Sequence, residues 1–356
     1  MVIKKILIAN QFGIGDVLFT FPMISAIRKS HPQANIGYLC NRRTEAIVKD
    51  NPDVNDIFIY EKDELRRRGS GGYFKGVLKL KKEIKNKKYD IAFDLTLSRL
   101  FGFLFFLAGI KRRIGYDYKG RGIFLTDKIK INGYHDKHMV LYYADLLKFV
   151  NIELRDLKME LFVKNEDKIW ADNLFKQNKI GENDTVVAII PGGGASWGKD
   201  AIIKQWDKEN FAKVADELNK KRNAKIILMG SAKDKTLCDR IKEILHDKAI
   251  DITGKTTLGQ FAATLKKCKL AVCNDGGPLH VAVCAGIKTV SIFGPVDEKV
   301  YGPLPLGGNH LVAKADIVCR PCYKNFKYKK CQGLECLKNV PVGEVIKACE
   351  KLLGES

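Results

Sequence analysis

The chain has 356 residues, of which 46% are apolar and 29% charged, and its formal net charge at pH 7 is +21. This composition is typical of a soluble globular protein, and a chain of this length predicts two domains, each able to bury a core without a disulfide framework. The positive charge favours an acidic partner, which could be nucleic acid, an anionic membrane surface or a phosphorylated substrate.

The N-terminal residues predict a strand over Ile3–Ala9, a glycine turn, and a helix over Val17–Ser30. The turn is similar to a dinucleotide fingerprint, but Leu18 stands where the third glycine would be. It also carries a carboxylate, Asp16, where a bound phosphate would disfavour an anion. From these residues alone, Asp16 is either a helix N-cap or a reacting group.

Two apolar segments bear on membrane targeting. Lys4 and Lys5 precede only four apolar residues, too few for the core of a signal peptide. The longest apolar run, Leu100–Ile110, has eleven residues, whereas a membrane-spanning helix needs about 20. We interpret this run as a buried helix, with shallow contact with a membrane as the alternative. We expect a cytoplasmic protein, with peripheral contact as the only membrane association.

Further strands are predicted over Asn35–Cys40, Asp56–Tyr60 and Asp90–Asp94, and their alternation with helices predicts a parallel sheet. The segment Glu61–Asp90 carries eleven Lys and Arg residues against five Asp and Glu. We expect a mobile basic loop, including Ser70–Gly72, that leads into a basic helix. This helix is either a solvated face or a landing surface for an anionic acceptor.

A polar stretch around Val163–Asp184 separates this series from a second one of the same kind. The second series predicts a doubly wound half like the first, in which ligands bind at the carboxyl ends of the strands. Its predicted strands are Thr185–Ile190, Ala224–Met229, Leu270–Cys273 and Thr289–Phe293, and its predicted helices are Phe211–Lys221, Pro278–Ala285 and Val342–Leu353.

The segment CNDGGPLHVAVCAG, residues 273–286, predicts an anion site. Gly276 and Gly277 form a turn between a buried strand and a helix, and Pro278 suits the first helical position. Exposed N–H groups and the helix dipole would attract a phosphate. Asp275 could cap the helix or order the loop, and His280 could reach the phosphate or pack. The alternative is a tight turn without a ligand.

A second glycine-rich segment, PGGGASWGKDAIIKQW, covers residues 191–206. Its glycines and Ser196 permit a ligand to approach the backbone closely, and Lys204 could neutralise a diphosphate. No GxxxxGK[ST] motif is present, which argues against a P-loop hydrolase. No Asp-x-Asp pair is present to hold a metal on a nucleotide sugar, so we expect no metal site there.

Four of the ten cysteines lie close together in the sequence, at Cys319, Cys322, Cys331 and Cys336. Their spacing is compatible with a tetrahedral zinc ion, although the second pair is not a CxxC. The alternative is a reduced, tightly folded loop, because the chain shows no export signal that would favour disulfides.

Together these segments resemble glycosyltransferase family 9, the ADP-heptose:lipopolysaccharide heptosyltransferases. The similarity begins with GDVLFTFPMISAIRKSHPQANIGYL, continues with the Lys204-x-Trp206 stretch, and includes NDGGPLHVAVCAGIKTVSIFGPVD. RRIGYDYKGRGIFL and the cysteine-rich CRPCYKNFKYKKCQGLECLKNV also have counterparts in the family. The motifs keep the family's order over nearly the whole chain, with Gly276 in place of the usual hydroxyl residue.

The resemblance implies a fold of the α/β class and GT-B type, in which two Rossmann-like doubly wound domains face each other across a cleft. On this basis the acceptor-binding domain covers 1–165, a linker 166–184, the donor-binding domain 185–340 with its Cys-rich loop at 319–336, and a terminal helix 341–356. The implied catalytic residues are Asp16, as the base of an inverting and metal-independent transfer, and Lys204. The implied donor-binding residues are Ser196, Lys204, Asp275, Gly276, Gly277 and His280, with Asp234 as a ribose partner.

The resemblance also implies the substrates. The donor would be a nucleotide sugar, ADP-heptose, acting as substrate without any cofactor, and the acceptor an anionic glycolipid such as the lipopolysaccharide inner core. Such an acceptor implies peripheral contact with the cytoplasmic face of the inner membrane. One alternative is a nucleotide-sugar epimerase of the same fold, which would need no basic acceptor surface. The other is a basic nucleic-acid-binding protein, but no zinc-finger, RNP or helix-turn-helix pattern is present, so we expect no nucleic-acid partner.

Overall fold

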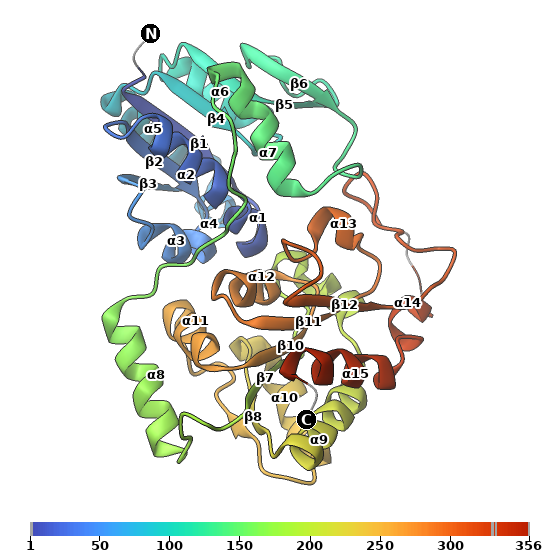
Figure 1. The fold of residues 1–356 in the computed structure, drawn as a ribbon. Coiled ribbons are helices and arrows are strands. Elements are labelled where there is room, and N and C mark those ends of the chain that lie inside the picture. Colours follow the sequence, from blue (N-terminus) through green and yellow to red (C-terminus); the bar gives the residue numbers. More distant parts are fainter. Residues whose placement is uncertain (1–2, 329–330, 332, 355–356) are drawn as a thin grey trace. The chain divides into compact units, whose positions relative to one another are not determined.

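The fold consists of two six-stranded parallel β-sheets, each covered by helices (Figure 1). The computed structural model describes residues 3–328, 331 and 333–354. The chain divides into two compact units, unit 1 over Met1–Lys158 and unit 2 over Met159–Ser356. The α/β class with two parallel sheets is therefore confirmed, and each unit is described separately below.

Unit 1 has the strand order β3-β2-β1-β4-β5-β6. All pairs are parallel, and in the register Ile6 of the central strand lies opposite Ile36 on one side and Ile91 on the other. The strands are β1 (Lys5–Ala9), β2 (Asn35–Cys40), β3 (Asp56–Ile59), β4 (Ile91–Asp94), β5 (Arg112–Tyr118) and β6 (Asp127–Ile131). The helices are α1 (Ile14–Leu18), α2 (Phe21–Ser30), α3 (Arg42–Lys49), α4 (Lys62–Arg67), α5 (Gly69–Lys87), α6 (Arg99–Leu107), α7 (Met139–Leu147) and the 3-10 turn η1 (Lys148–Val150).

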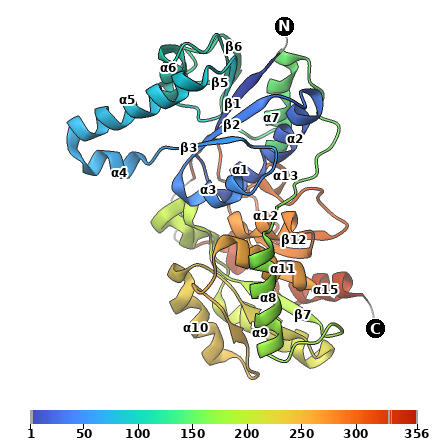
Figure 2. The same cartoon turned by 90° about the vertical axis from the view of Figure 1, so that its left-hand side faces the viewer.

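Helices cover both faces of the unit 1 sheet, which explains why its central strands are apolar on both sides. Leu7 and Ala92 pack on one face against α5 and α6, which contribute Ile84 and Phe105 to the same core. On the other face the Tyr38 hydroxyl is 2.9 Å from the Thr20 hydroxyl, which lies just before α2. Figure 2 shows α4 and α5 as a pair of helices that extends from the rest of unit 1.

Unit 2 has the strand order β12-β11-β10-β7-β8-β9, again with parallel neighbours. The strands are β7 (Val186–Ile190), β8 (Lys225–Leu228), β9 (Ile250–Asp251), β10 (Leu270–Asn274), β11 (Lys288–Phe293) and β12 (His310–Lys314). The α-helices are α8 (Asn165–Gln177), α9 (Lys208–Arg222), α10 (Lys235–Ile244), α11 (Leu258–Lys267), α12 (Gly277–Cys284), α13 (Glu298–Tyr301), α14 (Glu335–Lys338) and α15 (Val342–Leu353), and the 3-10 segments are η2 (Ala195–Lys204) and η3 (Ala232–Asp234).

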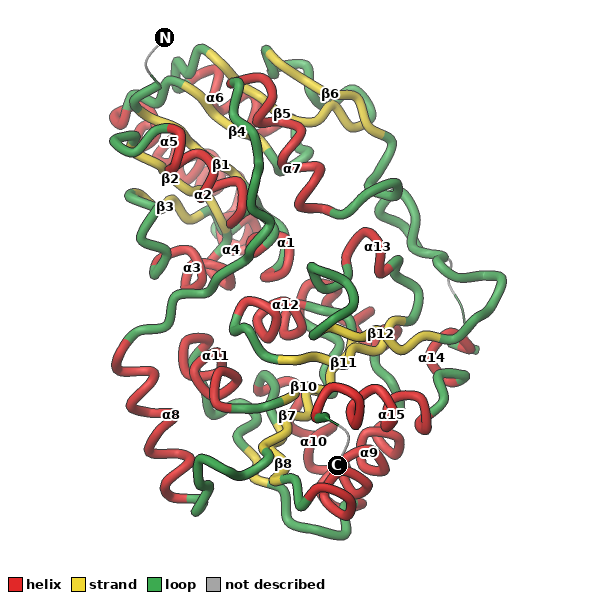
Figure 3. The backbone as a smooth tube through the Cα atoms, viewed as in Figure 1, coloured by secondary structure: helices red, strands yellow, loops and turns green. Residues whose placement is uncertain are grey.

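The core of unit 2 lies between its sheet and the helices α9, α10 and α15. Phe211 of α9, Ile241 of α10 and Val345 of α15 pack against strand residues such as Ile189 and Val272. Figure 3 shows that much of the chain between β12 and α14 is loop, and the cysteine-rich segment lies there. The apolar strands thus fix a rigid sheet, while the loops that follow the strands carry the polar residues.

Two local predictions were wrong. The helix predicted over Val17–Ser30 is divided into α1 and α2, because Pro22 lies at the start of α2 and has no N–H to donate into a preceding turn. The basic loop predicted within Glu61–Asp90 is helical, since α4 and α5 cover most of it and Ser70–Gly72 lie inside α5. α5 is held by burial of Leu80 and Ile84, which outweighs the low helix propensity of its glycines.

The apolar run around Leu100–Ile110 forms α6, in which four residues are buried and others face solvent. No helix in the described part of the chain has the length and apolar character to cross a membrane.

Candidate active site

Most of the predicted site residues lie where the strand order changes direction in each sheet, whereas Asp234 follows β8. In unit 2 this switch lies between β10 and β7, and in unit 1 between β1 and β4. Ligands of open parallel sheets bind outside the carboxyl ends of the strands at such a switch. The loops that follow β7 and β10 carry the two glycine-rich segments, and the loop after β1 leads to Asp16.

The two glycine-rich turns of unit 2 pack backbone against backbone. A Cβ atom on Gly276 would lie 3.3 Å from the carbonyl oxygen of Gly193, and one on Gly194 would lie 3.5 Å from the amide nitrogen of Gly277. Gly194 also has a φ of +78°, which side chains rarely adopt. Because Gly277 is the first residue of α12, the amides of this helix N-terminus lie beside the loop after β7. This arrangement presents N–H donors and a helix dipole to an anion.

Lys204 and Asp275 form a buried ion pair next to these turns. The Lys204 Nζ atom is 2.6 Å from Asp275 Oδ2, and the residues are 6% and 3% exposed. The same ammonium lies 4.7 Å from the centroid of the Trp197 ring. Trp197 in turn contacts Tyr323 and stacks on Tyr328, both from the cysteine-rich loop. Lys204 is therefore held in place from two sides, by a carboxylate and by an aromatic face.

Asn274 ties the two loops together, and the sequence analysis missed it. Its Oδ1 accepts a hydrogen bond from the Trp206 amide at 3.1 Å, and its Nδ2 donates to the Pro191 carbonyl at 2.7 Å. Asn274 is 1% exposed, so both bonds are shielded from water. The residue fixes the start and the end of the loop that carries Lys204. In the sequence, Asn274 is a polar residue at the end of an apolar strand and the first residue of the segment NDGGPLH, but neither feature reveals its two hydrogen-bond partners.

The other predicted donor residues have different surroundings. Asp234 Oδ2 accepts hydrogen bonds from the Ser231 amide at 2.8 Å and hydroxyl at 2.7 Å, so it caps η3. It lies against the loop after β7, because a Cβ atom on Gly192 would be 2.5 Å from Asp234 Oδ1. His280 is 3% exposed within α12. The side chain of Ser196 lies outside the described residues.

In unit 1, Asp16 is half-buried in the first turn of α1. Its Oδ2 accepts a hydrogen bond from the Gly13 amide at 3.0 Å, so the carboxylate does serve the helix N-terminus. Asn10, which is fully buried, donates from Nδ2 to the Asp16 carbonyl at 3.1 Å and to the Tyr143 hydroxyl at 3.3 Å. The side chain of the buried Asn10 thus holds the Asp16 turn in place, as Asn274 holds the loop after β7 in unit 2.

The two tyrosines near Asp16, Tyr134 and Tyr143, are held in their neutral forms. Burial raises the pKa of Tyr134 and of Tyr143 well above its ordinary value, and the negative charge of Asp16 adds to each increase. Asp94, at the end of β4, is also buried, and this burial raises its pKa to about 6 although hydrogen bonds from Thr96 lower it. Thr96 donates to Asp94 Oδ1 from its amide at 3.0 Å and from its hydroxyl at 2.6 Å. Asp94 was not predicted, and it occupies the other side of the switch from Asp16.

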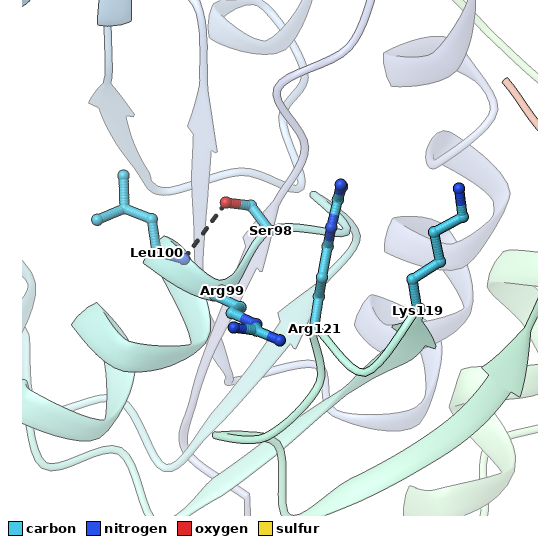
Figure 4. A pocket seen from close by; sticks show the side chains of 5 residues that line it. All are labelled: Ser98, Arg99, Leu100, Lys119 and Arg121. Atoms are coloured by element: carbon cyan, nitrogen blue, oxygen red, sulfur yellow. Dashed lines mark hydrogen bonds between the residues drawn. The ribbon is translucent and has the colours of Figure 1, made fainter. Parts of the chain in front are cut away.

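A basic pocket of about 390 Å³ opens at the same edge of the unit 1 sheet. Figure 4 shows its lining, which comes from the N-terminus of α6 and from the loop after β5: Ser98, Arg99, Leu100, Lys119 and Arg121. The Ser98 hydroxyl caps α6 by accepting a hydrogen bond from the Leu100 amide at 3.3 Å. In the part of the chain that the structure describes, none of the three cationic side chains forms a salt bridge. The pocket therefore suits an anionic group.

The cysteine-rich loop brings its thiols near one another. The pKa of Cys336 is raised to about 11, chiefly by burial and in smaller part by the nearby thiols of Cys322, Cys319 and Cys331. All ten cysteines are free. Within the described residues, no three His, Cys, Asp or Glu side chains are arranged to hold a metal ion.

Comparisons with sequence families, with curated proteins and with solved structures all find glycosyltransferases of one family. Residues 77–332 match the sequence profile of glycosyltransferase family 9 (heptosyltransferase). Lipopolysaccharide heptosyltransferase 3 of Escherichia coli (strain K12) is 25% identical over 353 residues, covering 96% of each chain. The structure of a family 9 glycosyl transferase from Veillonella parvula has a TM-score of 0.81 at 24% identity, covering 100% of this chain and 99% of that one. The E. coli heptosyltransferase WaaC, solved with ADP-2-deoxy-2-fluoro heptose, has a TM-score of 0.70 at 17% identity, covering 98% of this chain and 99% of that one.

Proposed function

Because the chain belongs to glycosyltransferase family 9, the heptosyltransferase family, we propose that it transfers a heptosyl group from ADP-heptose to an anionic glycan of the lipopolysaccharide core. The observation that carries this proposal is the anion site of unit 2, where Lys204 and the amides at the start of α12 meet at the switch between β10 and β7. A nucleoside diphosphate is the ligand class that such a site fits. WaaC, with the same fold, was solved with an ADP-heptose analogue, and this supports ADP-heptose as the donor.

In the proposed reaction, a hydroxyl oxygen of the acceptor attacks the anomeric carbon of the heptose, and the bond from that carbon to the diphosphate oxygen breaks. Asp16 accepts the proton of the hydroxyl, and the configuration at the anomeric carbon is inverted. Negative charge grows on the departing ADP, where Lys204 and the α12 amides would stabilise it. These groups are fixed before the reaction by Asp275, Trp197 and Asn274, so little reorganisation is needed.

We propose that the transfer needs no divalent cation, because the ammonium of Lys204 and the helix dipole of α12 supply the positive charge. Transfer should then proceed at an unchanged rate in excess EDTA. Loss of activity in EDTA, with recovery on adding magnesium or manganese, would contradict this part of the proposal.

We assign the acceptor's anionic group to the basic pocket of unit 1. Arg99, Lys119 and Arg121 line this pocket and have no carboxylate partners among the described residues, and the pocket opens at the edge of the sheet that also carries Asp16. A phosphate or carboxylate on the core oligosaccharide matches this chemistry.

The role of Asp16 is tested with Asp16→Asn. The amide Oδ1 of asparagine can still accept the Gly13 hydrogen bond, so the turn should keep its shape, but it cannot take up a proton. We expect transfer from ADP-heptose to fall by a factor of about 10² or more, since a positioned base contributes about 10²–10⁴. Thermal stabilisation of the protein by ADP-heptose should be unchanged.

The donor is tested by measuring thermal shifts with ADP-, GDP- and UDP-sugars. A shift with ADP-heptose and ADP, but none with GDP- or UDP-sugars, is the expected result. A preference for GDP or UDP would overturn the proposed donor while leaving the family membership intact.

The role of Asp16 has its own contrary outcome: near-normal turnover by Asp16→Asn would overturn Asp16 as the proposed base.

A further inference from the structure

Helix α6 carries more apolar surface than the core of unit 1 uses. Phe101, Leu104 and Phe105 point into that core and are almost fully buried. On the outer side, Phe103 and Phe106 are 41% and 52% exposed. A helix that served only to cover the sheet would have polar residues on this side. The outer face of α6 therefore needs an explanation other than folding.

The loop after β5 extends this outer face. The ring of Phe124 lies 5.0 Å from the ring of Phe103 and 6.1 Å from that of Phe106, measured between centroids. Arg113 holds the group together, since its guanidinium lies 5.5 Å from the Phe106 centroid and its Nε donates to the Phe124 carbonyl at 2.6 Å. We call this surface the phenylalanine patch, and it consists of Phe103, Phe106, Leu107, Ile123 and Phe124.

The rim of the phenylalanine patch is cationic. The segment 95–126, which contains the whole patch, has six Lys and Arg residues and a single acid, Asp117. Exposed members of this set include Arg99, Lys111 and Arg121, and none of these three forms a salt bridge within the described residues. Exposed aromatic side chains surrounded by unpaired cations are the combination that binds the headgroup region of an anionic bilayer.

The neighbouring helix repeats this combination. α5 packs beside α6 on the same face of the sheet, and both contribute to one core. Phe74 and Leu78 of α5 are 62% and 43% exposed, and they alternate with the exposed Lys75 and Lys79. Unit 1 thus presents two adjacent helices whose outer sides combine apolar and cationic side chains.

We propose that the phenylalanine patch docks on the surface of an anionic lipid bilayer, with its rings at the level of the headgroups and the surrounding cations against lipid phosphates. With nine residues, α6 is too short to span a bilayer, so the contact is peripheral. The occupant is a lipid surface rather than a second protein because the segment that carries the patch has six cations against one acid, a balance that complements anionic headgroups. This inference does not depend on the proposed transfer reaction.

Sedimentation with vesicles tests the proposal. The wild-type protein should sediment with vesicles of equal parts phosphatidylcholine and phosphatidylglycerol, and much less with phosphatidylcholine alone. The double variant Phe103→Ser, Phe106→Ser should lose binding by a factor of about ten or more, because two exposed apolar anchors are removed. Lys111→Glu should weaken binding to the anionic vesicles. Ile169→Ser is the matched control, because Ile169 of α8 is 54% exposed and lies in unit 2.

A tryptophan placed at the patch measures insertion directly. Phe106→Trp should show fluorescence quenching by brominated phosphatidylglycerol, whereas Ile169→Trp should match the wild-type background. The side chains involved lie outside the core of unit 1, so these variants should fold with only a small decrease in unfolding temperature and should transfer sugar to a delipidated acceptor at the wild-type rate. The rate of transfer to the delipidated acceptor separates a loss of membrane docking from a loss of the proposed catalytic function.

Three results would overturn the proposal. The first is equal sedimentation of wild type and the Phe103→Ser, Phe106→Ser variant with anionic vesicles. The second is equal quenching at positions 106 and 169. The third is a dimer without lipid that the same double variant converts to a monomer, because the patch would then be covered by a second copy of the chain.

Discussion

The buried pair of Lys204 and Asp275 gives the sharpest quantitative prediction. Lys204→Met removes the ammonium and leaves the Asp275 carboxylate in a site where it is 3% exposed. Removing one partner of a buried ion pair costs about 3–5 kcal/mol, because the remaining charge has lost its compensation. Unit 2 extends from residue 159 to residue 356, and for a unit of that size each 1 kcal/mol lowers the unfolding temperature by about 2–4 °C. We therefore expect a decrease of roughly 6–20 °C.

The double variant Lys204→Met, Asp275→Leu separates charge burial from packing. With both charges removed, much of the lost stability should return, because an apolar pair of similar volume often replaces a buried ion pair at little cost. Stabilisation by ADP, in contrast, should be lost in both variants, because both lack the ammonium. Calorimetric unfolding with and without ADP measures both effects. Asp275→Leu alone completes the set of variants. A cost of less than about 1 kcal/mol for Lys204→Met, together with additive effects of the two single substitutions in the double variant, would refute the role of the buried ion pair.

Three further predictions concern other parts of the site. The folded-state pKa of Asp94 is about 6, above its ordinary value of 3.8. The stability that the protonated Asp94 carboxyl contributes is therefore full below about pH 4 and is lost as the pH rises through 6. In urea titrations, the unfolding free energy of the wild type should fall between pH 4 and pH 8 by about 3 kcal/mol more than that of Asp94→Asn. The Cβ atom of Gly193→Ala would lie 2.2 Å from the Ala201 carbonyl oxygen, so this variant should lose ADP binding in a calorimetric titration. Gly181→Ala is the control and should keep ADP binding, because the nearest atom to its Cβ would be 3.7 Å away. Arg121→Glu should raise the KM for a phosphorylated acceptor by about tenfold or more while leaving the KM for ADP-heptose unchanged, and equal changes in both constants would argue against the acceptor pocket.

The central strands and the terminal helix could be predicted from the sequence because their patterns are strong. The strand predicted over Asn35–Cys40 and the helix predicted over Val342–Leu353 have the same bounds in the structure. β6, by contrast, alternates half-buried and exposed residues at a sheet edge, and β9 has only two residues. Such strands are defined by their neighbours rather than by their own composition, so no local pattern identifies them.

The residues of the candidate site could be predicted from the sequence, but the contacts that hold them in place could not. Glycines after apolar strands indicated the anion site, and Lys204 and Asp275 were both named, although their ion pair was not foreseen. The role of Asn274 depends on partners 68 and 83 residues away in the chain, which no local pattern reveals. Asp94 was visible at the end of a predicted strand, yet its perturbed pKa arises from burial, which only the folded chain creates. The functions of Asp16 and of the donor-binding residues stay predictions.

The cysteines differ in exposure, so a thiol reagent can be used to follow the state of the loop that carries the exposed ones. A thiol reagent reacts with the thiolate form, and burial raises the pKa of Cys40 and of Cys268 to about 12, which keeps them inert near neutral pH. Cys319 and Cys331, in contrast, are exposed in the loop whose tyrosines contact Trp197 beside Lys204. Alkylation would therefore begin in that loop. A donor that tightens the packing around Trp197 would slow the labelling, so the occupancy of the anion site could be followed in the unmodified chain.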